Sequence, residues 1–186
     1  MIRTRVGYCG GSTDSPTYHS LGDHSETIEL DYDPGIVTYE DLLADFLAWH
    51  ETGLRSMSVQ YRSAVFCRSD DEVAAAERAL ASPRSVFGAA ATSIERLKRF
   101  WPAEDYHQKY TLRGHRDIAA QLRARFTDES AFRDSTSAAR LNGWLDGWGN
   151  AAQIECELSL TGLSTRAQDE VRGVAGRRER VPRSIR

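Results

Sequence analysis

The chain has 186 residues, 40% of them hydrophobic and 27% charged, with a formal net charge of -3. This length suits one domain of roughly 100–150 residues and a smaller additional part. The slightly acidic balance gives no reason to expect nucleic acid as a partner. No apolar stretch approaches the ~18 residues of a membrane span, and the first residues lack the apolar core of a secretory signal. We therefore expect a cytoplasmic protein.

Three cysteines are present, Cys9, Cys67 and Cys156. Their odd number and wide spacing indicate neither a disulfide framework nor a zinc site. The five histidines likewise show no ligand-like spacing with cysteine or acidic residues. The simplest interpretation makes each cysteine a small buried apolar residue, above all Cys67, which ends an apolar run.

The first half of the chain predicts two strands and a helix. Residues 2–8 alternate between apolar and polar side chains, as in a strand. A domain rarely opens directly on such a strand, so we expect that sequence upstream of Met1 is missing. Residues 25–32 alternate in the same way and end at an Asp-Pro-Gly turn. An amphipathic helix follows from Thr38, its expected N-cap, to about residue 50.

The next elements are a strand at 63–67, a helix at 70–81 and a weak strand at 92–97, followed by a helical pattern at 103–126 with a weak point at Gly114. This alternation favours an α+β sandwich with helices packed on one sheet.

After residue 126 the composition changes. Residues 127–130 are acidic and small and resemble a linker, and a helical region covers 139–158. The last residues are rich in arginine, which is typical of a solvated tail or a weak anionic contact. The predicted organisation is a main domain at 1–126, a helical C-terminal extension at 127–170 and a basic, disordered tail at 171–186.

Six short motifs occur in order over residues 2–112. They are VGYCGG (6–11), SPTY (15–18), DHSE (23–26), YDP (32–34), QYRSAVF (60–66) and AEDYHQKY (103–110). Together they resemble the VGYxGG, NPTY, GHxE, YDP, QYRSAIF and AExYHQxY motifs of the MsrA family of peptide methionine sulfoxide reductases. The resemblance implies a ferredoxin-like α/β plait, here N-terminally truncated. It also implies reduction of methionine S-sulfoxide, in proteins or free, by thiol chemistry, without a metal or organic cofactor and with thioredoxin or another dithiol as reductant.

The resemblance assigns an acid, Glu26, and two site tyrosines, Tyr18 and Tyr61. Sulfoxide reduction needs a proton donor, and phenols can donate hydrogen bonds to the oxygen without carrying charge. The strand alternation also directs Glu26 toward the apolar side, where burial would keep a proton available near neutrality. His24 is expected to orient the segment that carries Glu26.

Two departures from the family pattern concern catalysis. The GCFWG motif, which carries the family's nucleophilic cysteine and its apolar substrate pocket, is absent, and the segment 50–60 contains no aspartate. Cys9, at the end of the first strand, is a tentative surrogate nucleophile, and Cys156 is a tentative resolving thiol.

Three hypotheses follow. The chain belongs to a reductase whose recorded start is internal, or it is a catalytically inactive binding module, or it is a nonfunctional fragment.

Overall fold

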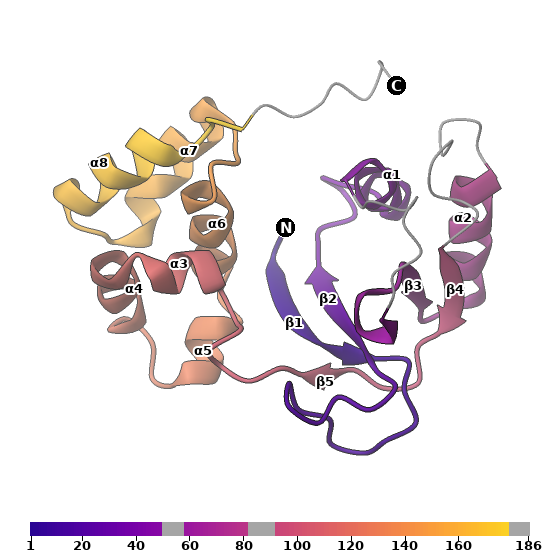
Figure 1. Cartoon of the computed structure of the whole chain (residues 1–186). Coiled ribbons are helices and arrows are strands. Elements are labelled where there is room, and N and C mark those ends of the chain that lie inside the picture. Colours follow the sequence, from indigo (N-terminus) through magenta and orange to yellow (C-terminus); the bar gives the residue numbers. More distant parts are fainter. Residues whose placement is uncertain (50–57, 82–91, 179–186) are drawn as a thin grey trace. The chain divides into compact units, whose positions relative to one another are not determined.

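The computed structural model describes residues 1–49, 58–81 and 92–178, which form two compact units (Figure 1). The sheet unit consists of Val6–Glu104, and the helical unit consists of Met1–Arg5 with Asp105–Arg186. Each is described by itself.

The sheet unit contains a three-stranded sheet in the order β2-β1-β5. The central strand is β1 (Arg3–Cys9), and β2 (Ser25–Asp31) and β5 (Trp101–Pro102) lie on its two sides. β5 runs antiparallel to β1, with Tyr8 opposite Trp101. The strands predicted at 2–8 and 25–32 are thus confirmed, whereas β5 has too few residues to show an alternation.

A second, two-stranded sheet pairs β3 (Ala64–Cys67) with β4 (Ser93–Arg96) in parallel. The helices α1 (Tyr39–Trp49) and α2 (Asp70–Ala81) contact each other, and α2 covers both strands. α1 begins as predicted: the Asp41 backbone N–H donates to Thr38 Oγ1 (3.1 Å), and the Thr38 hydroxyl donates to Asp41 Oδ2 (2.9 Å). Leu43, Cys67, Ala75 and Ala76 form the small core between these elements.

The strands therefore do not form the single sheet of the predicted plait within the described residues, although the mixed α+β class is confirmed. Side chains, rather than a backbone ladder, connect the two sheets. The Ser25 hydroxyl at the start of β2 donates to the Val59 carbonyl ahead of β3 (2.9 Å), and Arg68, just after β3, forms an ion pair with Glu29 of β2.

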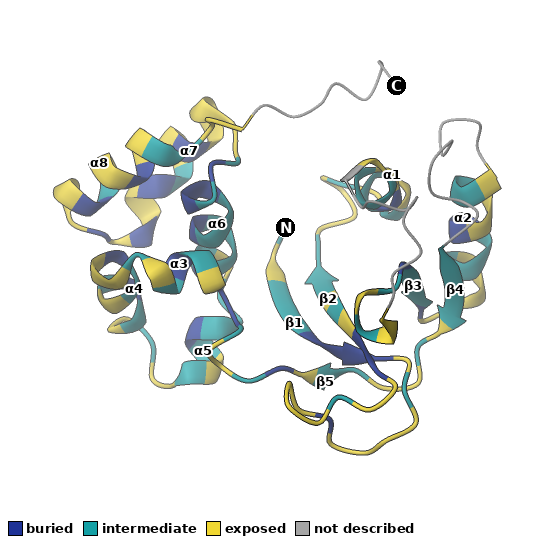
Figure 2. Ribbon diagram, viewed as in Figure 1, coloured by how far each residue is buried: buried dark blue, intermediate teal, exposed yellow. Residues whose placement is uncertain are grey.

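The helical unit consists of short helices around an apolar core. They are α3 (Tyr110–Gly114), α4 (Arg116–Arg123), α5 (Glu129–Arg133), α6 (Thr136–Leu145), α7 (Ala151–Leu158) and α8 (Thr165–Val174). Buried Leu, Ile, Phe and Trp side chains from α3 to α7 meet in this core with Ala167 and Val171 of α8, and Figure 2 marks buried residues in dark blue. None of the helices in the described part of the chain is long and apolar enough to cross a membrane.

Four sequence predictions for this region are corrected. The expected linker at 127–130 begins α5, because the Asp128 carboxylate caps the helix by accepting from the Ala131 backbone N–H (2.8 Å). The helical pattern expected at 103–126 begins only at Tyr110 and is divided at His115, after the weak point at Gly114. The region at 139–158 is divided where Gly147 and Gly149 have positive φ. The boundary expected at residue 170 falls inside α8; residues 179–186 of the expected tail lie outside the described residues.

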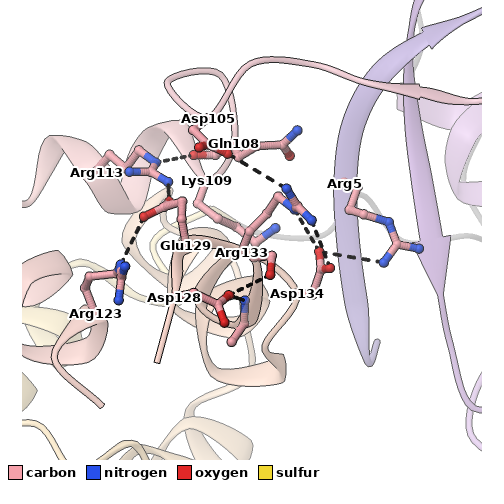
Figure 3. Close-up of polar contacts among 12 residues, drawn as sticks. Arg5, Asp105, Gln108, Lys109, Arg113, Arg123, Asp128, Glu129, Arg133 and Asp134 are labelled. Carbon is pink, nitrogen blue, oxygen red and sulfur yellow. Dashed lines mark hydrogen bonds and ion pairs between the residues drawn. The ribbon is translucent and has the colours of Figure 1, made fainter. Parts of the chain in front are cut away.

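A network of charged side chains ties the first residues to the helices (Figure 3). Arg5 and Arg133 both pair with Asp134, and Arg113 and Arg123 both pair with Glu129. Lys109, which is buried, donates from Nζ to the Thr4 carbonyl. Burial lowers the pKa of Lys109 to about 8, since the charged ammonium loses its hydration.

Candidate functional site

The Tyr18 loop, residues 10–24, joins β1 to β2 and begins with two glycines that allow close packing. Gly10 has φ +82°, and a Cβ there would lie 2.4 Å from Arg62 Nη2. A Cβ on Gly11 would lie 2.4 Å from Cδ2 of His24. Only glycine fits these approaches without displacing a neighbour, so the family-like Gly-Gly pair here has a steric basis.

His24 anchors this loop at the start of β2. Its ring is 2% exposed; Nδ1 accepts from the Gly11 backbone N–H (3.2 Å), and Nε2 lies 2.7 Å from the Thr13 carbonyl oxygen. Because a carbonyl can only accept, Nε2 must carry the proton, and this pair of contacts fits the neutral imidazole. The expected role of His24 is confirmed: it fixes the segment that ends two residues later at Glu26.

A buried polar group connects the start of β2 to the turn η1 (Val59–Tyr61). Ser25 is 1% exposed, donates to the Val59 carbonyl, and accepts from Nε of Arg62 (2.7 Å). Arg62 is itself held by both carboxylate oxygens of Glu95, with Nη2 3.0 Å from Oε2. Although burial acts to raise the pKa of Glu95, these hydrogen bonds hold it below its usual value. The turn is thereby fixed against the strand.

The three predicted site residues gather at this junction. Gln60 of η1 donates from Nε2 to Glu26 Oε1 (2.6 Å), which joins the turn directly to the carboxylate. The negative charge of Glu26 is the largest cause of a raised pKa of the Tyr61 phenol, with smaller contributions from burial and from Tyr18. Such couplings fall off with distance, which agrees with the expected grouping of the acid and the two phenols, and the bond from Gln60 is the direct contact between η1 and Glu26.

The expected burial of Glu26 is not found: its side chain is exposed. Tyr18 is 40% exposed, and Tyr61 is 56% exposed. The alternation along β2 holds, but at this end Ser25 faces the interior, and Ile28, which shares a face with Glu26, is 57% exposed. The side of β2 that the sequence marks as apolar is therefore open to solvent at Glu26.

Sequence reasoning missed two residues near the site, although both lie in quoted motifs. One is Gln60, described above. The other is Glu104, whose carboxylate accepts from the Tyr8 hydroxyl (2.8 Å) and from the Tyr18 backbone N–H (2.9 Å). Their positions in QYRSAVF and AEDYHQKY were a signal of importance, but no alternation or spacing could indicate their partners.

The thiols do not have the properties of a nucleophile at this site. Cys9 is fully buried, and burial raises its pKa to about 11, so that little thiolate exists at neutral pH. This weighs against Cys9 as the surrogate nucleophile. Burial likewise raises the pKa of Cys67, whereas Cys156 is exposed on α7 of the helical unit. Within the described residues no group of three or more acidic, histidine or cysteine side chains is arranged to hold a metal ion.

The exposed Glu26 carboxylate and the Gln60 amide are hydrogen-bonded to each other, the phenols of Tyr18 and Tyr61 are exposed as well, and apolar Ile28 shares the strand face of Glu26. Such a set can bind a ligand that has a strong acceptor oxygen next to a small apolar group.

Comparisons with known proteins identify the family of this chain. The family model for peptide methionine sulfoxide reductase matches residues 1–139. The chain is 38% identical over 167 residues to a peptide methionine sulfoxide reductase of Drosophila melanogaster, covering 88% of this chain and 67% of the fly protein. It is 35% identical over 153 residues to peptide methionine sulfoxide reductase A5 of Arabidopsis thaliana, and there it spans 59% of the plant protein's length.

Among solved structures, the chain is similar to the crystal structure of Mxr1 from Saccharomyces cerevisiae in reduced form. The TM-score is 0.55 at 28% sequence identity, and the match covers 61% of this chain and 71% of the yeast chain. From the family match and these relatives, this chain belongs to the peptide methionine sulfoxide reductase family.

Proposed function

We propose that the protein containing this chain reduces the S-sulfoxide of oxidised methionine, and that Glu26, Tyr18 and Tyr61 receive the sulfoxide oxygen. The observation that carries the proposal is the hydrogen bond from Gln60 Nε2 to Glu26 Oε1 (2.6 Å), which joins the turn that contains Tyr61 to the proposed acid. The Glu26 charge also raises the pKa of the Tyr61 phenol, with a smaller contribution from Tyr18. A sulfoxide oxygen accepts hydrogen bonds and has no proton to donate. It therefore suits two phenolic O–H groups and a carboxyl that can supply a proton.

The reaction requires a thiolate. The thiolate attacks the sulfoxide sulfur, Glu26 supplies a proton to the oxygen, and the oxygen passes to the attacking sulfur as a sulfenic acid. Methionine sulfur is reduced by two electrons and cysteine sulfur is oxidised by two. A second thiol then forms a disulfide and releases water, and a dithiol such as thioredoxin reduces that disulfide.

The nucleophile in this proposal comes from a GCFWG-like segment outside the 186 residues. Cys9 and Cys67 are buried with raised pKa values, and the exposed Cys156 belongs to the other compact unit. Cys156 remains a proposed resolving thiol. The complete α/β plait, thioredoxin as the partner and cytoplasmic residence likewise stay proposals.

The apolar part of the substrate has contacts available beside the acid. Ile28 lies two residues after Glu26 on the same face of β2, and Val59 of η1 is 50% exposed. Burying a methyl group against such side chains contributes roughly 1 kcal/mol, which favours the methyl sulfoxide end of a methionine side chain.

Binding measurements on this chain test the proposal without requiring turnover. We expect N-acetylmethionine (S)-S-oxide methylamide to bind about tenfold more tightly than the corresponding sulfide, because the sulfide lacks the acceptor oxygen. The R epimer should bind as weakly as the sulfide. Equal affinity for sulfide and sulfoxide, or no binding of either, would contradict the proposed function.

Two further measurements locate the nucleophile. With dithiothreitol as reductant, this 186-residue chain should not reduce the sulfoxide; stoichiometric reduction that disappears in Cys9→Ser would refute an external nucleophile. The in-frame genomic sequence upstream of Met1 should encode a GCFWG-like segment. Sulfoxide binding without such codons would instead support an inactive binding module.

A further inference from the structure

One glutamate outside the proposed catalytic group connects three separate segments of the sheet unit. Glu104 follows β5 by two residues, and both of its carboxylate oxygens are used. Oε2 accepts from the Tyr8 hydroxyl in β1 (2.8 Å), and Oε1 accepts from the Tyr18 backbone N–H (2.9 Å). These donors lie 96 and 86 positions away in the sequence, so the carboxylate makes a long-range connection to the Tyr18 loop.

Glu104 follows directly on the pairing of β5 with the central strand β1. Tyr8 is 1% exposed and lies opposite Trp101 in the β1–β5 pairing. The Ala103 backbone N–H extends this pairing by donating to the Val6 carbonyl (3.0 Å). Glu104 is thus held by its own backbone on one side and by a core phenol on the other.

The segment around Tyr18, by contrast, contains a short local backbone pairing. Thr17 and Ser20 exchange two backbone hydrogen bonds of 3.3 and 3.0 Å in an isolated bridge. Residues 12–15 and 17–20 are all exposed, and Ser15 has φ 52°, in the left-handed region. A bond from Tyr18 to a carboxylate is charge-assisted and about twice as strong as a neutral one. It therefore contributes more to the position of Tyr18 than the turn alone.

We propose that Glu104 is a positioning residue: it holds the Tyr18 backbone so that the phenol can meet the substrate oxygen beside Glu26. The role of Tyr18 in this inference rests on the proposed function. The clamp, by which we mean the two hydrogen bonds that Glu104 accepts from Tyr8 and Tyr18, does not depend on that function. A bound oxygen is recognised well only when its donors are already in place, and a displacement of about 1 Å weakens recognition strongly.

The test uses the isotopically labelled 186-residue chain and two readouts, the NMR signal of the Tyr18 amide and the affinity for N-acetylmethionine (S)-S-oxide methylamide. In Glu104→Ala we expect the Tyr18 amide proton to shift upfield and to exchange at least about tenfold faster. Sulfoxide affinity should fall on the order of tenfold. Glu104→Asp, one methylene shorter, replaces this variant if the alanine variant does not fold.

Two matched variants separate positioning from general stability. Glu104→Gln should restore affinity to within about threefold, because its amide oxygen can accept from Tyr18 while its amide group donates to the Tyr8 oxygen. Tyr8→Phe removes the other hydrogen bond to Glu104 but keeps the carboxylate that accepts from the Tyr18 N–H, so its effects on the Tyr18 amide signal and on the affinity should be smaller than those of Glu104→Ala.

Three outcomes would overturn the inference. They are an unchanged Tyr18 amide signal in folded Glu104→Ala, an unchanged affinity in that variant, and an equal loss of affinity in Tyr8→Phe. If the wild-type chain binds no sulfoxide, the proposed function fails, and the amide signal alone then decides whether the clamp exists.

Discussion

The carboxylate of Glu26 raises the pKa of the Tyr61 phenol, so the proposed acid and one of its proposed partners are electrostatically coupled in the folded chain. The coupling joins a residue at the start of β2 to a residue in η1, and Gln60 bridges the same two elements with a hydrogen bond.

This coupling predicts a shift in the titration of Tyr61. Glu26→Gln removes the negative charge and keeps the shape, so the Tyr61 phenol should ionise at lower pH than in the wild type. Tyrosine ring signals followed by NMR through alkaline pH report the change. Glu29→Gln is the control, because Glu29 lies three residues further along β2 and on its opposite face. It should leave the Tyr61 titration unchanged. An identical Tyr61 titration in Glu26→Gln would mean that the two groups are not neighbours in solution.

Gln60 should restrain the Glu26 carboxylate. Gln60→Leu keeps the side-chain volume and removes the donor, so we expect several-fold weaker binding of the methionine S-sulfoxide probe, with the free energy of unfolding changed by less than about 1 kcal/mol. Calorimetric titration and urea unfolding measure the two effects. Ser58→Ala, which alters only the cap of the same turn, serves as the comparison. If Gln60→Leu binds the probe with wild-type affinity, the hydrogen bond from Gln60 does not position Glu26 for sulfoxide binding.

The cysteines should differ in reactivity. At neutral pH, iodoacetamide should modify Cys156 in the native chain, with Cys9 and Cys67 reacting more than about tenfold more slowly because both are buried and carry raised pKa values. Peptide mapping by mass spectrometry identifies the alkylated positions, and the urea-unfolded chain, in which all three should react, is the control. Rapid native alkylation of Cys9 would restore it as a candidate nucleophile.

Lys109 should make the stability of the chain depend on pH. Its pKa is about 8 in the folded chain against an ordinary 10.5, so between these values the unfolded chain binds more protons, and stability contributed by this residue rises with pH. Below pH 8 both states are protonated and the burial cost is constant. Lys109→Met should therefore gain up to about 2 kcal/mol relative to wild type at neutral pH, allowing for solvent screening.

That advantage of Lys109→Met should disappear as pH approaches 10.5. Urea unfolding of both proteins at a series of pH values isolates the effect, since the other titrating groups are shared. A difference in stability that does not vary with pH would show that the ammonium is hydrated in the folded chain.

Two glycines should respond oppositely to alanine. In Gly11→Ala the new Cβ meets the His24 ring at 2.4 Å, and we expect a loss of about 1–3 kcal/mol in the free energy of unfolding. In Gly143→Ala, within α6, nothing lies within 4 Å of the new Cβ, and better helix propensity should add about 0.5–1 kcal/mol. Thermal unfolding distinguishes the signs; a stabilised Gly11→Ala would disprove the close packing of the loop on His24.

Local elements were predictable where one physical pattern dominates a segment. The alternation at residues 2–8, the Thr38 cap and the alanine-rich stretch at 70–81 each led to an element that the structure contains. The helices after residue 126 were predicted less accurately. Asp128 acts as a helix cap although its neighbours resemble a linker, and the hydrophobic periodicity does not reveal the positive φ of Gly147 and Gly149.

The sequence indicated which residues are candidates for the site, but it did not indicate their exposure or their hydrogen-bond partners. Motif resemblance selected Glu26, Tyr18 and Tyr61, whose roles stay predictions; the charge of Glu26 raises the pKa of the Tyr61 phenol. The alternation of side chains could not show which face of β2 is exposed to solvent. That depends on the buried Ser25 hydroxyl, which donates to the Val59 carbonyl and accepts from Arg62. The contacts of Gln60 and Glu104 depend on residues 34 and 86 positions away, which no local pattern records.

The short strand β5 has a consequence for self-association. Since the Ala103 N–H points to β1, and Trp101 has the same parity, the nitrogen of Pro102 between them points outward from the sheet. Proline has no N–H and the Trp101 N–H points to β1, so β5 presents no backbone donor to an incoming strand of another molecule along this outer rim. A sheet bordered in this way is a poor template for intermolecular β-pairing, which guards the chain against fibrillar aggregation along that rim.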